Sequence, residues 1–171
     1  MGEIKAPHEK LIAKVLCGGE TGADRAAVDF AIEHGVAYGG WVPLDGWAED
    51  LREAPGLLGR YSNFVPTKSA DVAVRTSLNV RDANATVVFA PMSAVSRGVR
   101  QTLDIATVLK RPVVVLDPHS PEAPPRLAEF LAVRSSGTIL NVAGPRESES
   151  PGLYQAVRSL LNGARGYFVT S

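Results

Sequence analysis

The chain has little cysteine, little histidine and no excess of charge of either sign. Among 171 residues there are one cysteine and three histidines, and lysine plus arginine balance aspartate plus glutamate at 18 each. The lone Cys17 excludes an internal disulfide and a zinc site built on paired thiolates, and it fits a reducing cytoplasm. The histidines are scattered along the chain, so we expect no metal site. A neutral chain also argues against nucleic acid as a partner, because proteins that bind the phosphate backbone are normally basic.

Long apolar runs are also missing. No stretch approaches the length of a membrane span, and the charged N-terminal "MGEIKAPHEK" lacks the apolar core of a signal peptide. We therefore expect no membrane partner and a cytoplasmic location. A length of 171 residues is that of one ordinary globular domain, and 45% hydrophobic residues are enough to form its core. We therefore predict a single domain, residues 1–171.

Short apolar runs alternate with segments of helical period, which is typical of an α/β protein with an open, mainly parallel sheet and helices on both faces. We predict strands at 11–17, 85–90, 112–117 and 138–144. Helices are predicted after each strand, beginning near Ala23, at 99–110, at 125–133, and after Ser150 as N-cap with Pro151 in the first turn. The β-branched run 112–117 is typical of a central strand. In the helix at 99–110, the spacing predicts an inward stripe of Leu103, Ala106 and Leu109.

Residues 36–82 fit this alternation less well. They are rich in glycine, proline and aromatic residues, and they show no lasting period before a helix predicted at 68–82. An ordered stretch of this kind tends to be a functional loop or lid. We therefore expect it to surround a site.

The segment "GGETGADR" (18–25) follows the first strand, where open parallel sheets bind ligands. Gly18, Gly19 and Gly22 would let backbone amides turn toward a phosphate or similar tetrahedral anion, and Thr21 would add a hydroxyl donor. The alternative, that these glycines only form a tight turn between strand and helix, stays open. Neither a dinucleotide-binding G-x-G-x-x-G nor a Walker motif is present, which disfavours ordinary dehydrogenases and P-loop NTPases.

Glu20 is an awkward neighbour for an anion, because a carboxylate repels one unless it binds a ribose hydroxyl, a metal or an arginine. Arg25, Arg97 and Arg146 are candidate cations near strand ends. Arg25 has an alternative partner, Asp29, one helical turn away. Trp41 either packs in the core or stacks on a ring of the ligand. Asp82 and Asp117 are candidates to accept hydrogen bonds from hydroxyl groups of the ligand.

Several stretches together resemble a known family, the putative molybdenum carrier proteins, also described as circularly permuted YpsA-like members of the SLOG branch of Rossmann-like proteins. They are "GGETGADRAAVDFAIEHG", "YGGWVP", "RTSLNVRDANATVVFA" and "LNVAGPRESESPGLY", and they span nearly the whole chain. The resemblance implies a Rossmann-like three-layer fold, a crevice for a nucleotide-like or cofactor molecule, and self-association into a homo-oligomer. By position, the family motifs fall on Gly18, Gly19, Thr21, Gly22, Asp24 and Arg25; on Gly39, Gly40 and Trp41; on Asn79, Arg81 and Asp82; and on Asn141, Gly144, Pro145, Arg146 and Glu147.

This chain departs from those relatives at two places. Relatives usually carry Gln where this chain has Glu20. They also carry a Ser-Gly-Gly-Thr turn and a helical Glu where it reads Ser96, Arg97, Gly98 and Val99, and then Asp104. The changed turn loses backbone freedom and a hydroxyl, and it gains in Arg97 a guanidinium that can grip phosphate.

Two functions follow as hypotheses. The first is a binding protein that holds a phosphorylated, nucleotide-like molecule or a molybdenum cofactor at the strand ends. The second, by analogy with lysine-decarboxylase-like relatives, is a nucleoside-monophosphate phosphoribohydrolase, with Glu20 or Asp104 as the catalytic carboxylate and Arg97 on the phosphate. A scaffold that has lost its ligand is a third alternative.

Overall fold

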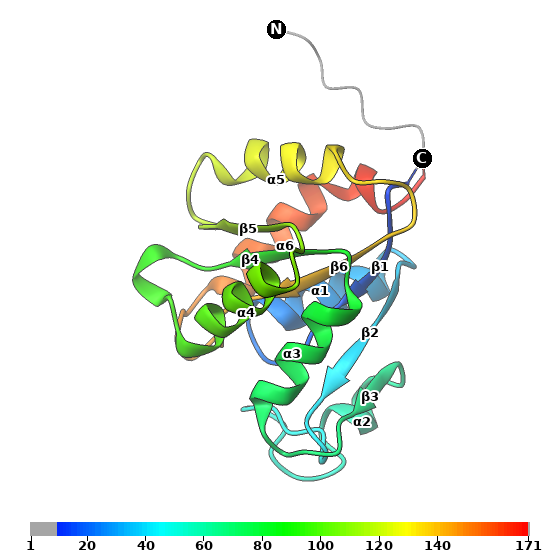
Figure 1. Cartoon of the computed structure of the whole chain (residues 1–171), viewed down its shortest axis with the longest axis vertical. Coiled ribbons are helices and arrows are strands. Elements are labelled where there is room, and N and C mark those ends of the chain that lie inside the picture. The colour runs from blue at the N-terminus through cyan, green and yellow to red at the C-terminus, as the bar shows by residue number, and fades with distance from the viewer. Residues whose placement is uncertain (1–9, 171) are drawn as a thin grey trace, which may run out of the picture.

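A computed structural model describes residues 10–170 as a six-stranded, all-parallel sheet with helices on both faces (Figure 1). The strand order is β3-β2-β1-β6-β4-β5. The expected α/β, Rossmann-like class is confirmed. The N-terminal residues 1–9, searched above for a targeting signal, and Ser171 lie outside the described residues.

Strands and α-helices alternate along the whole described chain, and the shortest strand, β3, has three residues. The strands are β1 (Ile12–Leu16), β2 (Ala37–Val42), β3 (Phe64–Pro66), β4 (Ala85–Phe89), β5 (Val113–Leu116) and β6 (Thr138–Ala143). The α-helices are α1 (Ala23–Glu33), α2 (Leu57–Arg60), α3 (Val72–Asp82), α4 (Arg97–Val108), α5 (Ala123–Ala132) and α6 (Leu153–Gly163). Short 3₁₀ turns lie at Met92–Ala94 and Arg165–Tyr167. None of the helices in residues 10–170 is long and apolar enough to cross a membrane.

The helices divide unequally between the two faces of the sheet. On one face α6 packs against both α1 and α5, and on the other face α3 packs against α4 (Figure 1). The main core lies under α1, α5 and α6 and contains Phe30, Leu140 and Phe168. Under α4 the core is small, with Val88, Ala90 and Val99 as its buried members. The sheet face beneath α3 and α4 is therefore filled less completely near the strand ends.

All four predicted strands are confirmed within two residues at either end. The sequence pattern did not predict β2 or β3. β2 contains two glycines, with Gly40 at φ 133°, and β3 has only three residues, so neither shows a strand-like apolar run. β5 is an edge strand, and the prediction of a central position was wrong. Its β-branched run has another cause, since α4 and α5 cover its two faces.

Two helix details also differ from prediction. Leu109 is 41% exposed and follows the end of α4, whose buried residues are Val99, Thr102 and Ala106. The N-cap of α6 is Gly152, because residues 146–152 form hydrogen-bonded turns that delay the helix beyond Ser150.

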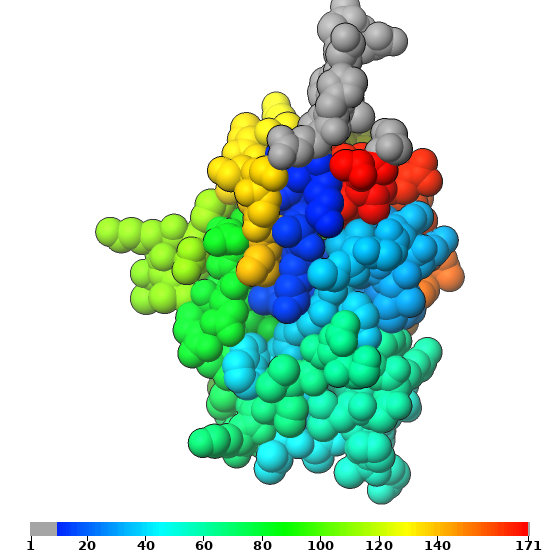
Figure 2. Space-filling model, turned by 90° about the vertical axis from the view of Figure 1, so that its right-hand side faces the viewer, coloured from blue at the N-terminus to red at the C-terminus, as the bar shows by residue number. Residues whose placement is uncertain are grey.

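The segment between β2 and α3 is a folded substructure rather than a lid. It forms the end of the molecule opposite the C-terminal residues, in cyan to teal in Figure 2. An apolar cluster joins it to the sheet through Cys17, Val42, Leu57, Tyr61 and Phe64. Apolar packing therefore fixes the position of this segment relative to the sheet.

Candidate functional site

A cleft of about 860 Å³ opens between the N-terminal halves of α3 and α4, above the C-terminal end of β6. The chain leaves β1 toward one face of the sheet and β4 toward the other, and β6 lies between them. This is a topological switch point, where open α/β sheets bind ligands. The cleft is lined by Asp71, Arg75, Thr76 and Ser77 from α3 and its cap; by Ser96, Arg97, Gly98, Arg100, Gln101 and Asp104 from α4 and its cap; and by Glu20, Gly144, Arg146 and Glu149 from two strand-end turns, with three apolar residues.

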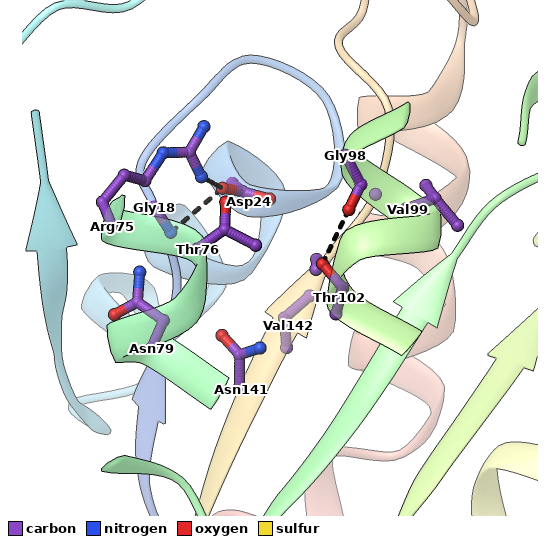
Figure 3. Close-up of a pocket in the computed structure, with 12 residues that line it drawn as sticks. Gly18, Asp24, Arg75, Thr76, Asn79, Gly98, Val99, Thr102, Asn141 and Val142 are labelled. Carbon is purple, nitrogen blue, oxygen red and sulfur yellow. Dashed lines mark hydrogen bonds and ion pairs between the residues drawn. The ribbon is translucent and has the colours of Figure 1, made fainter. Parts of the chain in front are cut away.

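A recess of about 60 Å³ lies deeper, against the sheet (Figure 3). It shares Arg75, Thr76, Gly98 and Gly144 with the cleft. Its walls are mostly polar although they are buried, with Asp24, Asn79, Thr102 and Asn141 each no more than 3% exposed. Polar groups buried in this number beside a cavity favour a ligand site.

Arg75 covers the glycine turn at the floor of the recess. Its guanidinium lies so close to Gly18 that a Cβ atom there would be 1.8 Å from Nη1, so a larger residue at this position would displace the Arg75 side chain. Asp24 accepts a hydrogen bond from the Gly18 amide at 3.0 Å, and its Oδ2 lies 3.5 Å from Arg75 Nη1. Burial raises the pKa of Asp24 to about 6, although Arg75 opposes the shift.

The N–H groups of the glycine turn are partly used within the protein. The Gly18 amide donates to Asp24 and the Thr21 amide to Glu20, while the Thr21 hydroxyl donates to Glu49. A Cβ at Gly22 would lie 2.6 Å from the Pro145 carbonyl oxygen, so this glycine permits close packing against the turn after β6. Tight packing, the alternative left open above, accounts for Gly22.

Two acidic residues of the segment after β2 tie the turn down. Asp50 binds Arg25 through two hydrogen bonds, of 2.8 and 2.9 Å, and Arg25 also donates to the Gly19 carbonyl. Glu49 accepts hydrogen bonds from Thr21 and from Ser148 of the turn after β6. Burial raises the pKa of Glu49, but these hydrogen bonds outweigh it and hold the pKa below its usual value.

Arg25 therefore has a structural role. It is 6% exposed, and its partner is Asp50 rather than Asp29, whose carboxylate accepts hydrogen bonds from Tyr61 and Tyr154. The alternative pair with Asp29, one helical turn away, does not form, because the side chain of Arg25 turns toward the glycine turn and away from the helix surface.

Comparisons with known proteins show the family and the fold. A family model described as the circularly permutated YpsA SLOG family matches residues 15–164. The chain belongs to this family. This SLOG chain is also similar to a putative molybdenum carrier protein from Syntrophus aciditrophicus SB, known from a crystal structure, with 32% sequence identity and a TM-score of 0.77. That match covers 91% of this chain and 96% of the other. No curated protein matches the chain.

The structure brings together about half of the site residues predicted for this SLOG protein. The cleft or its recess is lined by Gly18, Glu20, Asp24, Asn79, Ser96, Arg97, Gly98, Asp104, Asn141, Gly144 and Arg146. The other predicted residues do not line either cavity: Gly19, Thr21, Gly22, Arg25, Gly40, Trp41, Arg81, Asp82 and Asp117.

The residues left outside have other partners. Trp41 donates to Asp82 at 2.7 Å and, with Gly40, lines a separate cavity of about 200 Å³ beside Lys14. Arg81 forms an ion pair with Asp82. Asp117, which follows the edge strand β5, accepts a hydrogen bond from the His119 amide. Cys17 is fully buried, and burial raises the pKa of its thiol, so it packs as an apolar residue.

Sequence reasoning predicted Asn79 of α3 but missed the N-terminal half of this helix. Arg75 and Thr76 line both cavities. Site residues were expected in the segments that follow predicted strands, and α3 follows β3, which the sequence pattern did not predict. Arg100 and Gln101 were missed because they lie one turn into α4, beyond the strand-end segment. A capping Asp71 followed by Arg75 was the available signal for α3.

Proposed function

We propose that this SLOG protein binds a phosphorylated small molecule of nucleotide type in the cleft between α3 and α4. One observation carries the proposal. Four arginines from three different segments, Arg75, Arg97, Arg100 and Arg146, line a single cleft at the switch point of the sheet. Four carboxylates line the same cleft, but Glu20, Asp71 and Glu149 already accept hydrogen bonds within the protein. Arg97 and Arg100, by contrast, form no ion pair among residues 10–170, and these unpaired cations favour an anionic ligand.

The helix termini support the same assignment. Both α3 and α4 direct their N-terminal ends to the cleft, and each is capped by a side chain, Asp71 or Ser96. The caps occupy the amides of Ala73 and Val99, and a helix N-terminus stabilises anions through its remaining first-turn amides and the helix dipole. The volume of about 860 Å³ is in the range of clefts that hold nucleotide-sized molecules.

The relative's name suggests a molybdenum-containing ligand as cargo. Residues 10–170 contain no group of three or more histidine, cysteine, aspartate or glutamate side chains able to hold a metal ion. The arginines fit an oxyanion instead. Molybdate, or the phosphate group of a molybdenum cofactor, is therefore the form in which the cleft would accept such cargo.

Thermal shift and calorimetry against AMP, ADP-ribose, molybdopterin and molybdate test the proposal. A bound ligand at about a hundred times its dissociation constant is expected to stabilise the fold by roughly 2.7 kcal/mol. Arg97→Ala should weaken binding about tenfold, since it removes from the protein a charged group that donates hydrogen bonds to the ligand. Arg126→Ala, which removes the same charge from the exposed surface of α5 on the other side of the sheet, is the matched control. Absence of any shift with all four ligands would refute the proposal.

A phosphoribohydrolase is the second candidate. Glu20 and Asp104 line the same cleft as Arg97, as this reaction requires of a carboxylate and a phosphate-binding arginine. If AMP is the substrate, incubation with the protein releases free adenine, and Glu20→Gln or Asp104→Asn abolishes the release. Binding of AMP without release of adenine rules this candidate out for AMP.

A further inference from the structure

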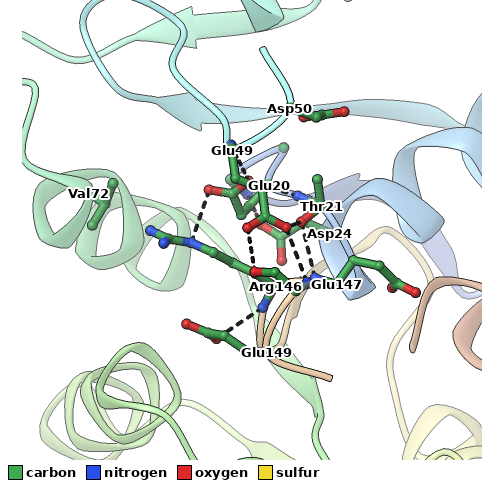
Figure 4. Close-up of polar contacts among 12 residues, drawn as sticks. Glu20, Thr21, Asp24, Glu49, Asp50, Val72, Arg146, Glu147 and Glu149 are labelled. Atoms are coloured by element: carbon green, nitrogen blue, oxygen red, sulfur yellow. Dashed lines mark hydrogen bonds and ion pairs between the residues drawn. The ribbon is translucent and has the colours of Figure 1, made fainter. Parts of the chain in front are cut away.

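The guanidinium of Arg146 is held on two sides. Its Nε lies 3.3 Å from Oε2 of Glu20, and its Cζ lies 5.2 Å from the centre of the Trp47 ring. Figure 4 shows the side chain running from the turn after β6 toward α3, where Val72 lies. Within residues 10–170, the two terminal nitrogens of Arg146 form no hydrogen bond. They are therefore free to bind a ligand.

Glu20 is itself fixed in one orientation. Its Oε1 accepts hydrogen bonds from the amides of Thr21, at 3.0 Å, and Glu49, at 2.9 Å. These donors belong to two different segments, so together they orient the carboxylate. The side chain is 6% exposed, and its Oε2 accepts no hydrogen bond from any described residue. Buried oxygens without hydrogen bonds are uncommon because their burial is unfavourable. The positive charge of Arg146, 3.3 Å away, stabilises this one.

Trp47 reaches Arg146 from a third segment. The residues that follow it are secured by the Glu49 and Asp50 contacts described above, and its own amide donates to Asp45 at 3.2 Å. An indole ring attracts a guanidinium through its negative face. The ring and the carboxylate thus confine Arg146 from two directions.

We propose that Glu20 and Trp47 are positioning residues that act through Arg146. They hold its two terminal nitrogens as a fork facing the cleft, so that the site selects an oxyanion able to accept two parallel hydrogen bonds, such as a phosphate monoester. This inference rests on the proposed function, because it assigns Arg146 to the anionic group of the ligand. An arginine ordered in advance loses less conformational entropy on binding than a free one.

The first test needs no ligand. Phenylglyoxal modifies accessible guanidinium groups, and mass spectrometry reports the rate at each arginine. Glu20→Gln and Trp47→Leu are each expected to raise the modification rate of Arg146 about threefold, because each removes one of its two holding contacts. Arg97, an exposed cleft arginine with no ion pair among residues 10–170, should keep its rate and serves as the internal reference. An unchanged rate at Arg146 in both variants overturns the inference.

The second test uses AMP binding. Glu20→Gln should weaken AMP binding about fivefold, although it removes a negative charge, because the fork is no longer held. Glu149→Gln removes the same charge from the same cleft and keeps an acceptor for the Arg146 amide, so it should raise the affinity. In an Arg146→Ala background, Glu20→Gln should change the affinity less than about twofold, since the two residues act as one unit.

The outcomes separate the inference from the proposed function. If Glu20→Gln raises the affinity as Glu149→Gln does, Glu20 only repels the ligand and the inference is wrong. If the fivefold loss persists in the Arg146→Ala background, Glu20 acts through the glycine turn and the inference is also wrong. If the wild-type protein binds none of the phosphorylated ligands, the proposed function fails, and the phenylglyoxal rates still decide whether Glu20 and Trp47 position Arg146.

Discussion

Replacing Gly144 by alanine is expected to lower the free energy of unfolding by about 3 kcal/mol, as overpacking of a rigid interior site does. A Cβ atom at this position would lie 2.4 Å from the carbonyl oxygen of Phe89 and 2.7 Å from Cβ of Ala23. The first neighbour is backbone at the end of β4 and the second opens α1, so neither can move aside without shifting an element. Urea unfolding measures the loss.

Gly163→Ala is the matched control for this substitution. Gly163 ends α6, and an added Cβ there would meet no atom within 4 Å. Alanine has the higher helix propensity, so this variant should be slightly more stable than wild type, by about 0.5 kcal/mol. Equal stability of the two variants would show that the junction of β4, β6 and α1 is looser than the structure describes.

The second large effect is a dependence of stability on pH that arises from Asp24. Its pKa is raised to about 6 by burial, against 3.8 for the free side chain. Between these values the folded protein holds the proton that the unfolded chain releases, so the free energy of unfolding falls as the pH rises through this window. The fall from Asp24 alone is expected to be on the order of 3 kcal/mol by pH 7.

Asp24→Asn isolates this contribution. An asparagine does not titrate, yet its side-chain oxygen can still accept the hydrogen bond from the Gly18 amide. Urea unfolding of both proteins from pH 4 to pH 7 gives the difference in stability at each pH. Wild type should lose stability relative to the variant as the pH rises, and parallel curves would mean that Asp24 does not take up its proton near pH 6.

The amino-acid sequence by itself determined the fold class and most of the strand-end turns of the site. Strands buried in a parallel sheet are mostly apolar, as β4 and β5 are, and they alternate with helices of regular period, so both patterns are local. Glycine and arginine after a strand are local signals too. For this reason the sequence alone predicts Gly18, Arg97, Gly144 and Arg146 as site residues, and the structure places them around one pair of connected cavities.

Only the tertiary structure decided which polar residues share a cavity and which pair with one another. Arg75 comes from a helix whose preceding strand has three residues and no recognisable pattern. The pairing of Arg25 with Asp50, and of Arg146 with Glu20 and Trp47, joins positions 25 to 126 residues apart. The reason is physical: propensity and periodicity act between near neighbours in the chain, whereas ion pairs and close packing depend on crossings of the chain that no local pattern encodes.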